Sequence, residues 1–100
     1  MGKRQTLTFT KAGADYNQIN TDLFAAMNNT TFESYSVNTN SQRTVTHSFD
    51  SDTNTLTVIR DWTNDSDYNT YLTTYSSERT TTQTALEADG FTVTESVEDL

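Results

Sequence analysis

Short stretches in which apolar and polar residues alternate recur along the chain, and they predict the strands of a sheet. A threonine, an apolar residue and a second threonine occur together in Thr6–Thr10, Thr44–Thr46, Thr55–Thr57 and Thr92–Thr94. Because side chains alternate across a strand, each triplet sends its apolar residue to one face and its threonines to the other. The pattern predicts an antiparallel sheet with one apolar face and one face lined by threonine.

Two other segments have the three-to-four-residue spacing of amphipathic helices. The first runs from Asp15, its expected N-cap, to Asn28. The second begins at Asn64–Asp67 and continues to Ala88, with an apolar stripe that thins out between Ser76 and Thr84. Gly90 stands where a left-handed C-terminal cap is expected.

The strands and helices together predict an α+β domain of the ferredoxin-like class. The expected strands are Gln5–Thr10, Phe32–Val37, Arg43–Phe49, Thr55–Trp62 and Phe91–Thr94, with turns at Asn38–Gln42 and Asp50–Asn54. If the two strands before Asp50 form one kinked strand, the order is β-α-β-β-α-β, which builds an antiparallel sheet with two helices on one face. We expect a single domain over residues 1–100, with residues 1–4 and 95–100 frayed.

The composition narrows the range of functions. A formal net charge of -8 and a pI of about 4.2 argue against binding to a nucleic-acid backbone. No apolar run is long enough for a membrane span, and the lack of cysteine excludes disulfides and thiolate chemistry. We expect a cytoplasmic protein without a cofactor, in the host cytoplasm or the virion if a phage encodes it.

The candidate catalytic residues are His47 and the aromatic residues Trp62, Tyr68 and Tyr71. His47 is the chain's single histidine and shares strand parity with Val45 and Phe49, a position typical of a core residue. The three aromatic residues can line a pocket between a helix and the sheet, although such a stripe more often forms core. The sequence alone does not decide between these roles.

A weak candidate metal site lies in the turn after the third expected strand. Asp50, Asp52 and Asn54 match the first three ligand positions of a calcium loop of the EF-hand kind. Thr55 occupies the position of the required glycine, and strands flank the loop in place of helices. The interpretation we favour is therefore a hairpin turn without a metal.

From Thr55 to Asn64 and from Asp67 to Leu72, the chain resembles the dimeric α+β barrel superfamily, in particular the antibiotic-biosynthesis monooxygenase family. In that family a strand ending in an acidic residue and Trp runs into an amphipathic helix. The resemblance implies a homodimer formed by packing of sheets, and in some members oxidation of aromatic or haem substrates without a separate redox cofactor. Haem-degrading relatives use an Asn, a Trp and a His, where this chain has Gln5, Tyr71 and about Thr81.

Three functions remain open at this point. The preferred one is a non-catalytic, homodimeric interaction or accessory protein, since the sequence offers no combination of base, nucleophile and oxyanion donor. The second is a cofactor-independent monooxygenase of the barrel type. The third is an acidic nucleic-acid mimic that binds a host protein, for which the following acids are expected near one end of the hairpin and helix start: Asp50, Asp52, Asp61, Asp65 and Asp67. The composition is also similar to that of small proteins of tailed bacteriophages.

Overall fold

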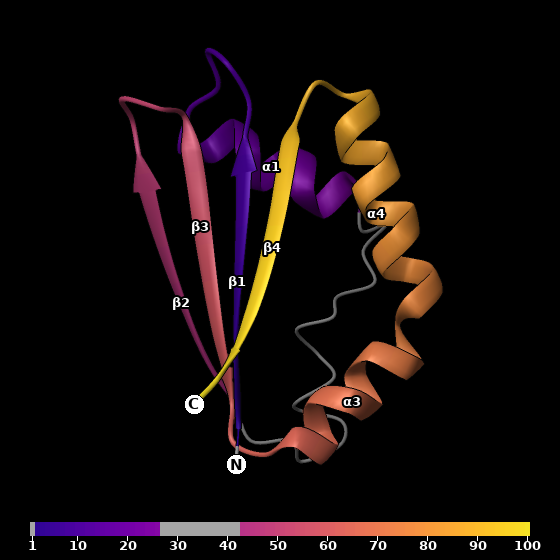
Figure 1. The fold of residues 1–100 in the computed structure, drawn as a ribbon. Coiled ribbons are helices and arrows are strands. Elements are labelled where there is room, and N and C mark those ends of the chain that lie inside the picture. Colours follow the sequence, from indigo (N-terminus) through magenta and orange to yellow (C-terminus); the bar gives the residue numbers. More distant parts are fainter. Residues whose placement is uncertain (1, 27–42) are drawn as a thin grey trace.

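The computed structural model describes residues 2–26 and 43–100, and within them four strands form one antiparallel sheet. The strands are β1 (Lys3–Thr10), β2 (Arg43–Asp50), β3 (Thr55–Trp62) and β4 (Thr92–Asp99), and their order across the sheet is β2-β3-β1-β4 (Figure 1). The same described residues contain the helices α1 (Tyr16–Ala26), α3 (Asp65–Thr74) and α4 (Ser76–Ala88). The predicted α+β class with an antiparallel sheet is confirmed.

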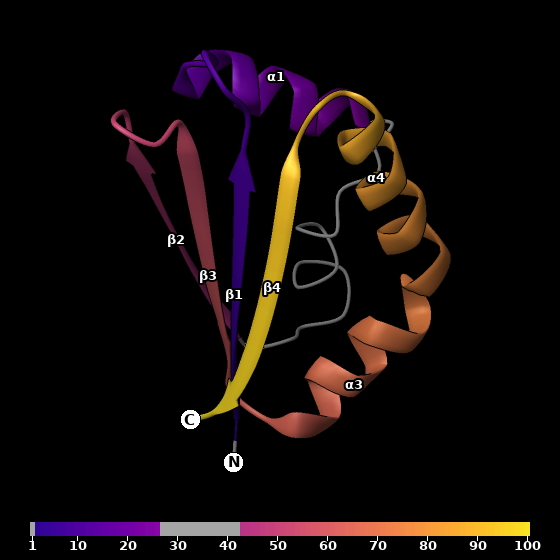
Figure 2. The same ribbon diagram turned by 45° about the horizontal axis from the view of Figure 1, so that its top comes forward.

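All three helices pack on the same face of the sheet. This face carries Phe9 of β1 and Leu56 and Val58 of β3, which form one buried cluster with Ile19 of α1 and Leu86 of α4. In Figure 2, α1 lies across the strand ends near the β2–β3 hairpin, and α4 lies beside β4 and rises from α3 toward the same end of the sheet. The opposite face has no helix over it among the described residues.

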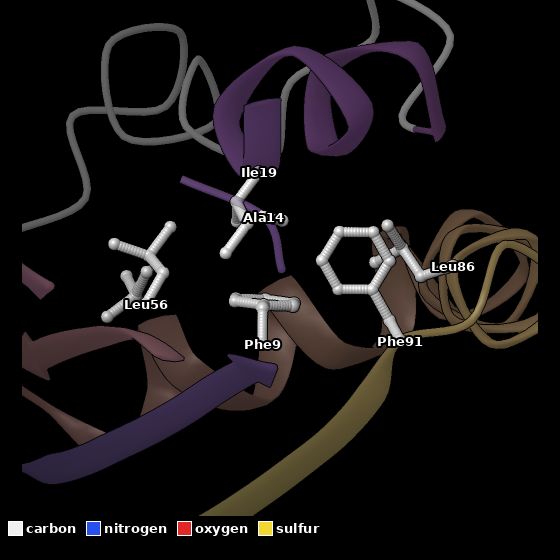
Figure 3. Close-up of a cluster of buried hydrophobic side chains, with 7 residues drawn as sticks. Phe9, Ala14, Ile19, Leu56, Leu86 and Phe91 are labelled. Atoms are coloured by element: carbon white, nitrogen blue, oxygen red, sulfur yellow. The ribbon is translucent and has the colours of Figure 1, made fainter. Parts of the chain in front are cut away.

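The centre of this cluster is a stack of side chains between the sheet and α1. Figure 3 shows Ile19 and Ala14 directed toward the ring of Phe9, with Leu56 on one side and Phe91 and Leu86 on the other. Ile19 and Leu56 are fully buried, and Leu86 is almost so. Burying a side chain of this size stabilises a fold by about 1.5–3 kcal/mol, so these contacts fix α1 and α4 on the sheet.

A second, aromatic cluster joins α3 to the end of β3. The ring centroids of Trp62 and Tyr71 lie 4.8 Å apart, and those of Trp62 and Tyr68 lie 5.9 Å apart. These three side chains are buried, and Leu72 and Tyr75 pack against them. The apolar stripe predicted for the start of the second helix therefore forms core.

The N-caps of α1 and α3 are the residues that the sequence predicts. The Asp15 side chain accepts a hydrogen bond from the Gln18 amide at 2.8 Å, and the Asn64 side chain accepts one from the Asp67 amide at 2.8 Å. Each cap satisfies an amide that the first turn of a helix leaves open. Gly90 has φ of 91°, as its position past the C-terminus of α4 predicts.

The second predicted helix is divided, which makes three described helices where two were expected. Tyr75 has φ of -111° and ψ of 23°, ends α3 and begins α4. The apolar stripe thins directly after Tyr75 in a run rich in serine and threonine, so neither packing nor helix propensity favours a continuous helix there. The helix axis can therefore change direction at this point, as Figure 1 shows.

The last strand is longer than predicted. β4 continues to Asp99 and pairs with all of β1, from Thr10↔Thr92 to Lys3↔Asp99. Lys3 bonds to the Asp99 carboxylate, and the Leu100 amide donates to the Gly2 carbonyl at 3.0 Å. Residues 95–99 are therefore part of the sheet, and β1 begins at Lys3.

The remaining sequence predictions fall outside the described residues. They are the strand at Phe32–Val37, the turn at Asn38–Gln42 and the last turn of the first helix up to Asn28.

Candidate functional site

The face of the sheet that no described helix covers is a regular array of hydroxyl-bearing residues. Strand register aligns three rows across the sheet, and we call these residues the threonine face. The rows, from β2 through β3 and β1 to β4, are Asp50-Thr55-Thr10-Thr92, Ser48-Thr57-Thr8-Thr94 and Thr46-Ile59-Thr6-Ser96. Every member except Asp50 and Ile59 carries a hydroxyl group, so the predicted partition of apolar and threonine faces is confirmed.

Several hydroxyl groups of the threonine face bond to one another across the strands. The Thr10 and Thr55 hydroxyls are 2.8 Å apart, and the Thr8 hydroxyl bonds to that of Thr94. Such pairs satisfy the polar atoms within the sheet. The next row along the strands carries Arg4, whose guanidinium donates to both oxygens of Asp61 at 2.8 and 2.9 Å.

The other face of the sheet borders a cavity of about 660 Å³ beneath α1 and α4. Its volume lies within the usual range for small-molecule sites. Apolar residues from three strands and two helices line most of it: Leu7, Phe9, Leu23, Leu56, Val58, Leu86 and Val93. At one end the lining becomes polar.

The polar end of the cavity is organised around Gln5, which is fully buried. The Gln5 carbonyl oxygen lies 3.5 Å from Nη1 of Arg60 and 3.5 Å from the indole nitrogen of Trp62, and it accepts from both. Its amide nitrogen donates to Glu95 at 2.5 Å. Arg60 is itself only 6% exposed, so the sheet holds a guanidinium inside the molecule.

Arg79 of α4 completes this polar cluster. It donates to both carboxylate oxygens of Glu95 at 2.6 Å and lies over the Tyr71 ring, 5.7 Å from its centroid. Burial on its own lowers the pKa of Arg79, but Tyr71 and Glu95 more than compensate and raise it. Burial, together with the charge of Glu95, also raises the pKa of Tyr68.

Sequence reasoning did not identify Arg60, Arg79 or Glu95 as candidates, and it reached Gln5 only through a family resemblance. A signal was nevertheless present, because the other inward residues of the strand that carries Arg60 are apolar, and Glu95 lies between two inward valines, Val93 and Val97. Register places Gln5 directly opposite Arg60. Two polar residues facing each other on an apolar sheet face indicate a satisfied pair or a binding site.

The structure separates His47 from the other three candidate catalytic residues. Trp62, Tyr68 and Tyr71 pack together, and Tyr71 alone of these three also borders the cavity. His47 lies on the edge strand β2 and is exposed, although it too borders the cavity. Its register partner is Val58, four residues along β3 from Trp62 and about 13 Å away by strand geometry. His47 is therefore not part of the aromatic cluster.

The candidate metal ligands form hydrogen bonds within the protein: Asp50 and Asp52 bond to each other in the β2–β3 turn, and Asn54 joins that turn to the segment before α1. The Asp50 carboxylate accepts from the Asp52 amide at 2.9 Å, which is an Asx turn. Asn54 has a positive φ of 53°, and its side chain donates to the Ala14 carbonyl at 3.0 Å and accepts from the Gly13 amide at 3.3 Å. No group of three His, Asp or Glu side chains in residues 2–26 and 43–100 is placed to hold a metal ion.

The acidic residues proposed for nucleic-acid mimicry do not gather at one end. Asp50 and Asp52 lie at the hairpin that begins β3, whereas Asp61, Asp65 and Asp67 lie at its other end, where α3 starts (Figure 1). The expectation that they cluster is wrong because the hairpin and the helix start are separated by the whole length of β3.

Comparison of the chain with protein-family models, with curated proteins and with solved structures finds no match. Within the described part of the chain, no helix is both long enough and apolar enough to cross a membrane. The geometry of the two sheet faces therefore carries the functional argument.

Proposed function

We propose that this chain is a non-catalytic interaction protein that forms a homodimer by packing two threonine faces together. The observation that carries the proposal is the composition of that face. The chain has a net charge of -8, yet two of the three rows of the threonine face contain no charged residue: Ser48-Thr57-Thr8-Thr94 and Thr46-Ile59-Thr6-Ser96. Surfaces that remain in water are usually much more charged than this.

An uncharged patch suits the symmetry of a dimer of identical chains. In a two-fold interface the same patch meets itself, so a charge close to the axis faces its own copy. Ile59 and Thr6 lie side by side in one of the uncharged rows, and both are partly buried already. The pairing of Thr8 with Thr94 and of Thr10 with Thr55 satisfies hydroxyl groups inside each copy, which lowers the cost of removing them from water.

The area of the face supports a dimer of modest stability. Each strand has eight residues, and four strands lie side by side. With a rise of about 3.3 Å per residue and a spacing of about 4.8 Å between strands, this side of the sheet, which consists of the threonine face and the adjoining row with Arg4 and Asp61, covers about 500 Å². Two copies bury about 1,000 Å², the size at which a specific interface becomes plausible.

The topology also supports assigning the chain to the ferredoxin-like class. The helix α1 follows β1, the helices α3 and α4 follow β3, and all three lie on one face of a sheet with the order β2-β3-β1-β4. We propose that the chain pairs its sheets as dimeric α+β barrel proteins do. Its threonine face would then be the internal surface of the dimer.

A charge placed in the middle of the threonine face tests the proposal. Thr57→Lys introduces an ammonium into an uncharged row, and each dimer would bury two of them. Burial of unpaired charge is costly, so we expect the dimer dissociation constant to rise at least 100-fold, or about 2.8 kcal/mol. The measurement is sedimentation velocity over a concentration series.

Thr84→Lys is the matched control, because Thr84 is exposed on α4 and lies away from the threonine face. It adds the same charge and should leave the dimer intact. Circular dichroism establishes that both variants are folded. Equal dissociation of Thr57→Lys and Thr84→Lys would show that the face does not form the interface.

A further inference from the structure

The cavity beneath α1 and α4 has the size and the walls of a small-molecule site, and it lies on the other side of the sheet from the threonine face. Its volume is about 660 Å³, and ligand sites of this size are mostly apolar with a few polar groups that orient the ligand. Exposed residues such as His47 and Gln83 also border it, so the cavity opens to solvent. A ligand can therefore enter, and the polar groups of the lining decide which kind binds.

The arginine and glutamate side chains that border the cavity already bond within the protein. Arg79 donates to both carboxylate oxygens of Glu95 at 2.6 Å, and the Gln5 amide donates to the same carboxylate. Arg60 donates to Gln5 and has a further interaction besides. A charged ligand group would lose its hydration here and meet partners that are already bonded, which is costly. The lining therefore favours a neutral ligand.

Thr82 of α4 carries a buried hydroxyl group at the cavity. The residue borders the cavity and is only 7% exposed. Within residues 2–26 and 43–100, no group forms a hydrogen bond with this hydroxyl. Thr80 on the same helix instead donates to the Ser76 carbonyl one turn earlier, at 3.1 Å. Because buried hydroxyl groups are normally hydrogen-bonded, Thr82 is a donor that a bound molecule can satisfy.

Thr82 lies between the polar and the apolar part of the lining. Arg79, Thr82 and Leu86 are spaced three and four residues apart on α4, so they share one face of the helix, and all three border the cavity. Arg79 belongs to the polar cluster, whereas Leu86 is buried in the apolar cluster that also contains Val58. A molecule with one polar atom at Thr82 can therefore extend its apolar body toward Leu86 and Val58.

We propose that this cavity binds a neutral, largely apolar molecule that carries a hydrogen-bond acceptor, such as a ketone oxygen. The Thr82 hydroxyl donates to that oxygen, and the apolar body lies against Leu23, Val58 and Leu86. A hydrocarbon of the same shape leaves the hydroxyl without a partner, and a carboxylate brings a charge into a cavity whose arginines are already bonded. Neutrality and the acceptor together define the ligand class.

The first test uses the unmodified protein and the probe Prodan, a neutral naphthyl ketone whose emission shifts to shorter wavelength when it leaves water. Its competitors are 2-acetylnaphthalene, which is a neutral ketone, and 2-naphthoate, which has nearly the same shape and carries a charge. We expect wild type to bind Prodan, and 2-acetylnaphthalene to displace it at a concentration at least tenfold lower than 2-naphthoate does, because the carboxylate must be buried without a free partner.

Substitutions of Thr82 test the assigned donor. Thr82→Val keeps the shape and removes the hydroxyl, so its affinity for Prodan should fall at least threefold, whereas its affinity for the hydrocarbon 2-isopropylnaphthalene should not fall. Thr82→Ser keeps the hydroxyl and should bind Prodan within about twofold of wild type. Thr81→Val is the matched control, because Thr81 is exposed on α4, and it should leave both affinities unchanged. Circular dichroism establishes that each variant is folded.

Three results would overturn the proposal. They are failure of the wild-type protein to bind Prodan, equal displacement by 2-acetylnaphthalene and 2-naphthoate, and equal Prodan affinity in folded Thr82→Val and Thr81→Val. Each of these is separate from the oligomeric state, since the cavity lies on the other side of the sheet from the threonine face.

Discussion

Replacing Gln5 by Leu tests whether the buried polar cluster holds the end of the sheet together. The side chain is fully buried, accepts from Arg60 and Trp62, and donates to Glu95. The two accepted bonds are long at 3.5 Å and therefore weak, whereas the one to Glu95 is short at 2.5 Å. Leaving buried polar groups without their partner costs about 1–3 kcal/mol, so we expect Gln5→Leu to lower the unfolding free energy by about 2 kcal/mol.

The assay is equilibrium unfolding in urea, followed by far-ultraviolet circular dichroism because Trp62 contacts the altered residue. With a slope of about 1.3 kcal/mol per molar urea, the midpoint falls by about 1.5 M. Gln18→Leu is the matched control, since Gln18 is exposed on α1, and it should change stability by less than about 0.5 kcal/mol. If Gln5→Leu is as stable as Gln18→Leu, the hydrogen bonds from the Gln5 side chain to Arg60, Trp62 and Glu95 do not stabilise the fold.

Two further predictions concern the ends of the strands. The hydrogen bond from Arg4 lowers the pKa of Asp61, so the stabilisation it gives is present at neutral pH and lost as the pH falls below about 4. In urea unfolding, the stability difference between wild type and Asp61→Asn should therefore be largest at pH 7 and shrink as the pH falls below about 4; a difference that stays constant down to pH 2 would contradict this. Separately, a Cβ at Gly2 would lie 2.1 Å from the Trp62 carbonyl oxygen, so Gly2→Ala should cost about 1–3 kcal/mol in thermal unfolding; an unchanged midpoint would contradict this contact.

The alternation of residues was sufficient to predict the sheet and its two faces. In β3 the buried positions are Leu56, Val58, Arg60 and Trp62, with partly buried residues between them, as a period of two requires. The caps at Asp15 and Asn64 and the left-handed Gly90 were also predicted correctly, because each depends on local chemistry. Local chemistry therefore predicts where α1 and α3 begin and where α4 ends.

Pairing between distant segments was harder to predict. The extension of β4 to Asp99 depends on Lys3, which lies at the other end of the chain and bonds to Asp99. The sequence of Thr92–Asp99 taken alone is polar and acidic, and it has few of the apolar residues that mark a strand. The segment Thr92–Asp99 is a strand because it pairs with β1 along its whole length.

The candidate site could not be predicted from the sequence, because it depends on the pairing of the strands and on the position of α4 relative to the sheet. Gln5 and Arg60 are opposite each other in the sheet, but Arg79 joins them from α4, through the Glu95 carboxylate that it shares with Gln5. His47 was singled out because histidine is chemically versatile, yet its strand position leaves it exposed at the sheet edge. A polar residue at an inward position of a strand, such as Gln5 or Arg60, is therefore a better indicator of a site than residue type alone.

The most direct test of the central claim is the solution mass of the wild-type protein, measured by light scattering across a dilution series. The chain has a mass of 11.3 kDa. Packing of two threonine faces predicts about twice that mass at micromolar concentration and a return toward the monomer mass on dilution. A mass that stays at 11.3 kDa at every concentration up to the millimolar range would contradict the proposed dimer and leave the threonine face in water.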